Sequence, residues 1–200
     1  MKLGFLASHN GSNMQAVIDA CKTGRLKAIP AVVISNNSDS GALARAEREG
    51  IAHSHLSTKT HPDADALDAA ILQTLVDHEV ELVVLAGYMK KVGAKTLRHY
   101  ADRIVNIHPA LLPKFGGQGM YGVFVHQAVL EAGETETGVT IHLVNEEYDR
   151  GAILAQRKVA VIAGDSVESL AARVLETEHA FLVETLQKIV DGEIVLPQTT

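Results

Sequence analysis

The chain has 200 residues, 46% of them hydrophobic, which suits one globular domain, and we expect residues 1–200 to form it. The formal net charge of −6 and the 4% aromatic content argue against nucleic acid as a partner. No apolar run approaches the roughly 20 residues that a membrane span needs, and the N-terminus soon turns polar, so we expect a cytoplasmic protein without a membrane partner. The single cysteine, Cys21, excludes an intrachain disulfide framework and a thiolate metal cluster.

Short apolar runs alternate with helical patterns along the chain, which is typical of an α/β fold with a mainly parallel sheet. Strands are predicted at residues 3–7, 31–35, 52–56, 81–87, 103–108, 138–146 and 153–162. Helices are predicted where apolar residues recur every three or four positions: from Met14 to Cys21, up to Gly50, after Pro62, and from Asp165 to Ile189.

The last predicted helix carries an acid on its apolar side. Asp165 followed by Glu168 resembles a capping box at the start of this helix. Glu178 falls four positions after Val174 and four before Leu182, so it points toward the core side. Burying a carboxylate unpaired costs several kcal/mol, so Glu178 either has a partner or lies at the edge of the apolar stripe.

The polar segment SHNGSN, residues 8–13, follows the first predicted strand and precedes the first helix. In open α/β sheets, ligands bind beyond the carboxyl ends of the strands, and free N–H groups at a helix start attract anions. Gly11, Ser12 and Asn13 can supply such donors for a phosphate. The segment matches neither a dinucleotide fingerprint nor a P-loop, and a helix start without a ligand is the alternative.

The segment Asn106-Ile107-His108-Pro109 ends a predicted strand. Residues two apart on a strand project from the same face, so Asn106 and His108 point the same way. An amide that can donate to a developing oxyanion then lies beside an imidazole that titrates near neutrality. This pair suits acyl transfer without a covalent intermediate, and a purely structural histidine is the alternative.

Asp149 lies between two predicted strands, before Arg150 and Gly151. One interpretation is that this acid is only a turn residue. If the fold brings it to His108, it raises the pKa of the imidazole and orients the ring. His142 is either a core histidine or one that supports the site.

Other chemistries lack a matching pattern in the sequence. The 10 histidines do not form a consistent ligand set with acidic partners, so no metal is expected. A serine-nucleophile elbow, G-x-S-x-G, does not occur.

The assembled motifs resemble those of the folate-dependent glycinamide ribonucleotide formyltransferases. The resemblance rests on HNGSNMQAVIDACKTG, VVISN, ELVVLAGYMKKV, VNIHPALLPKFGG, HQAVLEAGETETGVTIHLVNEEYDRGAILAQ and AGDSVESLAARVLETEH, which together cover nearly the whole chain. Asn-x-His-Pro-(Ser/Ala)-Leu-Leu-Pro with a later Asp-x-Gly is specific to enzymes that use formyltetrahydrofolate. The Gly-Ser-Asn loop separates the glycinamide ribonucleotide enzymes from relatives that act on methionyl-tRNA.

The resemblance implies a Rossmann-like open sheet, mainly parallel, with helices on both faces and one antiparallel strand near the C-terminal part. It implies formyl transfer from 10-formyltetrahydrofolate, as co-substrate, to the amine of phosphoribosylglycinamide in purine (IMP) biosynthesis, by a monomer or homodimer. It also implies a cis Leu112–Pro113 bond.

The residue roles that the resemblance implies fall in three groups. Gly11, Ser12 and Asn13 would hold the substrate phosphate, and Glu178 would bind the ribose. The folate would lie against Met89, Lys90, Lys91, Val92 and Asn106. Asn106, His108 and Asp149 would be catalytic, with Asp149 keeping His108 protonated.

Two departures and three rival functions accompany this resemblance. Many family members have a folate-contacting arginine near position 64, where this chain has Ala64, with Lys59 or the backbone as a substitute. The loop 114–125 is longer than in some members. The rivals are hydrolysis of formyltetrahydrofolate, formylation of another amine and non-catalytic binding of a phosphate ligand. Because the sequence runs from its first predicted strand to its last predicted helix, we do not expect the extra domains of the hydrolase and tRNA enzymes.

Overall fold

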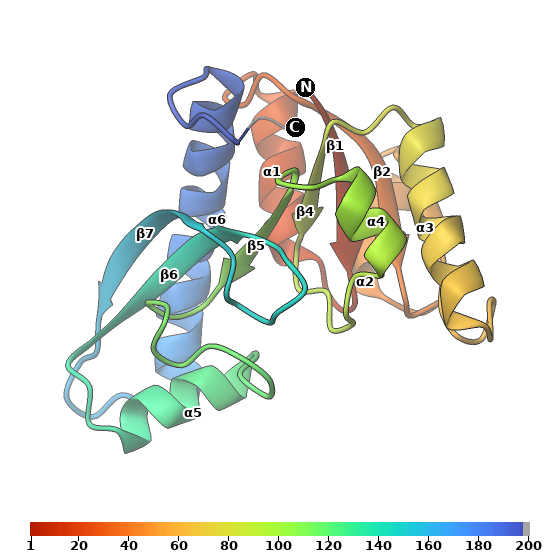
Figure 1. Ribbon diagram of the computed structural model, residues 1–200. Helices are drawn as coiled ribbons and strands as arrows, with labels where there is room; N and C mark the ends of the chain where they lie inside the picture. Colours follow the sequence, from red (N-terminus) through yellow and green to blue (C-terminus); the bar gives the residue numbers. More distant parts are fainter. Residues whose placement is uncertain (198–200) are drawn as a thin grey trace.

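The computed structural model describes residues 1–197 and contains one seven-stranded sheet in the order β3-β2-β1-β4-β5-β6-β7 (Figure 1). The strands are β1 (Lys2–Ala7), β2 (Ile29–Ser35), β3 (Ala52–His55), β4 (Leu82–Leu85), β5 (Ile104–His108), β6 (Glu136–Leu143) and β7 (Ile153–Ala160). Strands β1 to β5 are parallel, and β6 is antiparallel to both of its neighbours. The expectation of an open, mainly parallel sheet with one antiparallel strand is confirmed.

Helices cover both faces of this sheet (Figure 1). They are α1 (Ser12–Lys22), α2 (Gly41–Arg48), α3 (Ala64–Asp77), α4 (Ala94–His99), α5 (Val123–Glu131) and α6 (Val167–Val190). Alternate residues of β1 point to opposite faces: Phe5 packs in the cluster formed with α1, α2 and α6, and Leu6 in the cluster formed with α3 and α4. Within the described residues, no helix is both long and apolar enough to cross a membrane.

The structure differs from the sequence-based prediction at three helices. Helices α4 and α5 were not predicted; α4 has only six residues, and α5 follows Gly122 at a φ of 52° without a side-chain cap. The proposed capping box of Asp165 and Glu168 is wrong, because Ser166 caps α6 and exchanges hydrogen bonds with Ser169. Asp165 instead pairs with Arg173 at 2.7 Å.

The central strands place three loops at one edge of the sheet. Strand β1 pairs with β2 on one side and β4 on the other, so the direction of the strand order reverses between β1 and β4. Ligands bind at such switch points, beyond the carboxyl ends of the strands. The segments 8–11 after β1, 86–93 after β4 and 109–122 after β5 all begin at this edge.

Candidate active site

A cleft of about 840 Å³ opens at this edge of the sheet. Its lining comes from the loops after β4 and β5, the turn between β6 and β7, the facing sides of α1 and α6, and the first half of α5. Asn106, His108 and Asp149 all lie on its wall, together with Asn13 and Glu178. Residues far apart in the sequence therefore share one cavity.

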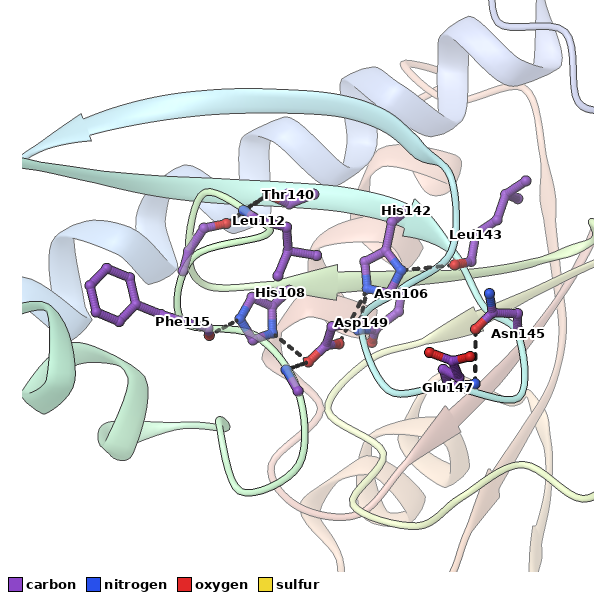
Figure 2. Close-up of polar contacts among 12 residues, drawn as sticks. Asn106, His108, Leu112, Phe115, Thr140, His142, Leu143, Asn145, Glu147 and Asp149 are labelled. Carbon is purple, nitrogen blue, oxygen red and sulfur yellow. Dashed lines mark hydrogen bonds and ion pairs between the residues drawn. The ribbon is translucent and has the colours of Figure 1, made fainter.

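The predicted amide, imidazole and carboxylate lie close together in the cleft (Figure 2). Nδ1 of His108 lies 3.7 Å from Oδ2 of Asp149, and Nε2 of His108 donates to the carbonyl oxygen of Phe115 at 2.7 Å. Nδ1 of the neutral ring is therefore the nitrogen that accepts a proton. The sequence-based expectation that Asp149 meets His108 is confirmed.

His142 joins this group from the neighbouring strand, because Asn106 and His142 are cross-strand partners. Its Nδ1 lies 2.8 Å from the carbonyl oxygen of Leu143, so this nitrogen carries the proton. Its Nε2 lies 3.0 Å from Nδ2 of Asn106 and 3.4 Å from Oδ1 of Asp149. A hydrogen bond to Asp149 needs a proton on Nε2, whereas the contact with Asn106 needs a lone pair there, so Nε2 makes only one of these two hydrogen bonds at a time.

Burial governs the protonation of His108, which is 3% exposed. Loss of water lowers the pKa of its imidazole below the usual value, and the charge of Asp149 and the Phe115 carbonyl only partly oppose this effect. Burial therefore opposes the effect expected of Asp149 on His108, and the loss of water outweighs the attraction of the carboxylate.

Asp149 remains a carboxylate in the same environment. Burial by itself raises the pKa of its carboxyl group, but contacts with His142, His108 and the Gly117 N–H together lower the pKa below its usual value. The Gly117 N–H donates to Oδ2 at 2.9 Å. One carboxylate thus contacts two imidazoles and the loop that follows β5.

Local backbone geometry explains the Asp-x-Gly motif. Asp149 has a φ of 55°, a left-handed conformation that Asp adopts more readily than most residues. A Cβ atom on Gly151 would overlap the carbonyl oxygen of Leu143 and lie 2.6 Å from its carbon. Glycine at 151 therefore lets the chain turn tightly from β6 into β7, with the Asp149 carboxylate in the cleft.

The helix start after β1 offers free backbone donors. Gly11, at a φ of 71°, precedes α1, and the Gln15 N–H bonds to its carbonyl oxygen at 2.9 Å. Within residues 1–197, the N–H groups of Ser12, Asn13 and Met14 have no backbone acceptor. Of the three predicted phosphate residues, Asn13 lines the cleft, whereas Gly11 and Ser12 are not part of its lining.

Glu178 faces this helix start from α6, as its position in the apolar stripe predicts. Burial raises the pKa of its carboxyl group to about 7, and the neighbouring Asn13 side chain opposes part of the rise. Oδ1 of Asn13 is itself buried without a hydrogen-bond partner among the described residues. This end of the cleft thus holds a buried acid that only Asn13 partly compensates and an unused amide oxygen, both able to receive hydrogen bonds from a ligand.

The loop after β4 forms another wall of the cleft. All four of its predicted folate residues, Met89, Lys90, Lys91 and Val92, belong to the lining. Ala64 and the alternative Lys59 do not belong to it. Tyr88 also lines the cleft; burial, and secondarily the charge of Asp68, raise the pKa of its hydroxyl to about 12.

Sequence reasoning missed His126, which lies on the unpredicted helix α5 and lines the cleft. The side chain is buried, its Nδ1 has no hydrogen-bond partner within residues 1–197, and burial, with His108 nearby, lowers the pKa of its ring. No local pattern marks it, because its proximity to His108 arises from the packing of α5. No group of three or more His, Cys, Asp or Glu in the described part of the chain could hold a metal ion.

An amide donor beside a paired imidazole and carboxylate, in a cleft at the carboxyl edge of an open α/β sheet, suits an enzyme that transfers an acyl group. Residues 1–186 match the family described as Formyl transferase, and the chain belongs to this family.

Individual relatives carry more specific names. The chain is 39% identical to the phosphoribosylglycinamide formyltransferase of Escherichia coli, over 97% of this chain and 89% of that protein. It is 41% identical to the chloroplastic phosphoribosylglycinamide formyltransferase of Arabidopsis thaliana, over 96% of this chain but only 66% of that longer protein. The crystal structure of glycinamide ribonucleotide transformylase 1 from Symbiobacterium toebii superposes with a TM-score of 0.91 at 38% identity, covering 98% of this chain and 91% of that one.

Proposed function

We propose that this chain transfers a formyl group from 10-formyltetrahydrofolate to the amine of phosphoribosylglycinamide, a step of purine biosynthesis. The names of the relatives support this reaction, and so does a cleft with an anion-binding end, an acyl-transfer centre and a separate loop wall. The partners are then small molecules, and the chain acts as a monomer or homodimer.

The ribonucleotide binds at the end of the cleft formed by α1 and α6. Its phosphate receives hydrogen bonds from the free N–H groups at the start of α1, where Gly11, Ser12 and Asn13 lie, and where the helix dipole favours negative charge. Its ribose hydroxyls lie against Glu178, whose carboxyl group has no cationic partner in the described structure. Ribose binding gives this buried acid hydrogen-bond partners that the protein alone does not supply.

The formyl donor binds between the loop after β4 and the turn that carries Asp149. The backbone of Met89, Lys90, Lys91 and Val92 receives the ring of the folate, and its formyl carbon lies beside Asn106 and His108. The side chains of Lys59 and Ala64 are not part of this wall.

The chemistry begins when the substrate amine attacks the formyl carbon. The second N–H of Asn106, free of His142, donates to the oxygen that becomes negative. His108 enters neutral and takes up a proton at Nδ1 as the amine nitrogen becomes positive. The Asp149 carboxylate, 3.7 Å away, stabilises the imidazolium until the proton passes to the departing folate nitrogen. The carbon–nitrogen bond to the folate then breaks, and formylglycinamide ribonucleotide leaves.

The observation that carries this proposal is the convergence of Asn106, His108 and Asp149 on one cleft. An absorbance assay of folate deformylation, run with and without phosphoribosylglycinamide, tests it. We expect turnover only when the ribonucleotide is present. Turnover without any amine would instead indicate a hydrolase, and absence of turnover in both cases would indicate a binding module.

A further inference from the structure

The loop from Gly87 to Gly93, which forms the folate wall of the cleft, is tied to the rest of the protein at its first residues by Ser8. Ser8 follows β1 and is 2% exposed. Its hydroxyl oxygen accepts the Met89 N–H at 2.7 Å and donates its own proton to Oδ1 of Asn36 at 2.5 Å. The Ser8 N–H donates to the carbonyl oxygen of Gly87 at 3.0 Å. The Met89 N–H is therefore already used and cannot bind a ligand.

Asp68 of α3 ties the other end of this loop. Its carboxylate accepts the Lys95 N–H at 2.7 Å, the Thr96 N–H at 3.2 Å and the Thr96 hydroxyl at 2.6 Å. Both N–H groups lie in the first turn of α4, which begins directly after Gly93. A Cβ atom on Gly93 would overlap the Asp68 carboxylate, so the close approach requires glycine at this position.

Between these two anchored ends, the loop has backbone N–H groups that make no hydrogen bond within the described part of the protein. Within residues 1–197, no protein group accepts the N–H groups of Lys90, Lys91 and Val92. A loop fixed at both ends with free donors between them presents a preorganised set of hydrogen bonds to a ligand, because the protein, and not the ligand, has already ordered its backbone.

We propose that Ser8 and Asp68 are positioning residues that hold this loop in the shape that binds the folate ring. Neither side chain lines the cleft, so both act through the backbone of the loop. The inference rests on the proposed function for the identity of the ligand, whereas the anchoring itself does not.

Hydrogen exchange at single amides tests the anchoring without any assay of activity. In Ser8→Ala, we expect the Met89 amide to exchange about tenfold faster, the change that corresponds to one lost hydrogen bond. Asp68→Asn keeps one of the two side-chain oxygens, so the same increase is expected at whichever of the Lys95 and Thr96 amides that oxygen no longer accepts. Asp65→Asn is the matched control: Asp65 lies on the same helix and pairs only with the exposed Lys95 side chain, at 2.6 Å, so these amides should exchange at the wild-type rate.

Steady-state kinetics tests what the anchoring does. Ser8→Ala and Asp68→Asn should raise the KM for 10-formyltetrahydrofolate about tenfold, while kcat and the KM for phosphoribosylglycinamide change little. A merely structural role would raise both KM values or lower kcat, and would overturn the proposal.

If the wild-type protein transfers no formyl group, the proposed function fails, and exchange of the Lys90, Lys91 and Val92 amides with added tetrahydrofolate decides the inference instead. Protection of these amides in the wild type that weakens in both variants supports the inference, and absence of protection in the wild type overturns the inference.

Asn36→Ala covers the case in which Ser8→Ala does not fold. This change keeps the Ser8 hydroxyl but removes the acceptor that orients it, at a half-buried position. Exchange at Met89 and the KM for the formyl donor should both increase, by less than in Ser8→Ala. Wild-type values for both would contradict the role of Ser8.

Discussion

Oδ2 of Asp149 contacts both the imidazole of His108 and the loop after β5: it lies 3.7 Å from Nδ1 of His108 and accepts the Gly117 N–H at 2.9 Å. The first contact stabilises charge on the catalytic ring. The second ties down the glycine-rich loop after β5, which also supplies the Phe115 carbonyl that accepts from the other side of His108. A single carboxylate thus sets both the electrostatics and the orientation of the imidazole.

Replacing this carboxylate by an amide should separate catalysis from binding. In Asp149→Asn, kcat should fall about 10²- to 10³-fold, because no negative charge remains to stabilise the imidazolium, while the KM for the ribonucleotide changes little. Steady-state kinetics with each substrate varied measures both.

Asp102→Asn is the matched control for this change. Asp102 has the same left-handed backbone, with a φ of 55°, but lies outside the cleft. It should retain wild-type kcat. A loss of equal size in both variants would show that the backbone conformation, and not the charge, is responsible.

The protonation of His108 gives a second prediction. Because burial lowers the pKa of its ring, an NMR titration should place the midpoint below 6.5, with the His108→Asn spectrum assigning the signal. Asp149→Asn should lower the midpoint further, because it removes the charge that favours the imidazolium. Activity should accordingly decline as the pH falls through this midpoint. A midpoint above 6.5, or an upward shift in Asp149→Asn, would contradict a neutral resting imidazole.

Much of the fold was accessible from the sequence because apolar runs mark its central strands and a clear period marks its longest helix. The segment 3–7 is a short apolar run, the last helix repeats apolar residues every three or four positions, and the polar segments that follow the strands mark the binding edge. The Asn106-x-His108 spacing also predicts a shared face without reference to any partner.

The missing parts depend on contacts between distant segments. Helix α4 follows a glycine, Gly93, and its first-turn N–H groups are capped by Asp68 on α3, so the neighbouring residues carry no capping signal. The contact of Asn106 with His142 depends on the register of β5 against β6. The net effect on the pKa of His108 depends on burial, which opposes the attraction that the Asp149 pairing alone predicts.

Glu178 should make the stability of the protein depend on pH. Its folded-state pKa, about 7, lies above the ordinary value of 4.5, so its contribution to stability is complete below pH 4.5 and is lost as the pH rises through 7. Relative to Glu178→Gln, the wild-type free energy of unfolding should therefore fall by about 3 kcal/mol between pH 4.5 and pH 8. Urea unfolding of both proteins across this range measures the difference, and a constant difference would mean that Glu178 ionises freely.

The turn that carries Asp149 should not tolerate a side chain at position 151. In Gly151→Ala, the new Cβ would overlap the Leu143 carbonyl oxygen at the end of β6, so the turn must move and take the Asp149 carboxylate with it. We expect a loss of about 1–3 kcal/mol in the free energy of unfolding, together with a fall in kcat.

Gly50→Ala separates the two effects, because Gly50 has a φ of 68° and open space around it, away from the cleft. The free energy of unfolding of Gly50→Ala should fall by about 1 kcal/mol through backbone strain alone, and its kcat should not change. Denaturant unfolding and the formyl-transfer assay measure both variants, and a Gly151→Ala protein with normal kcat would mean that the turn can shift without moving Asp149.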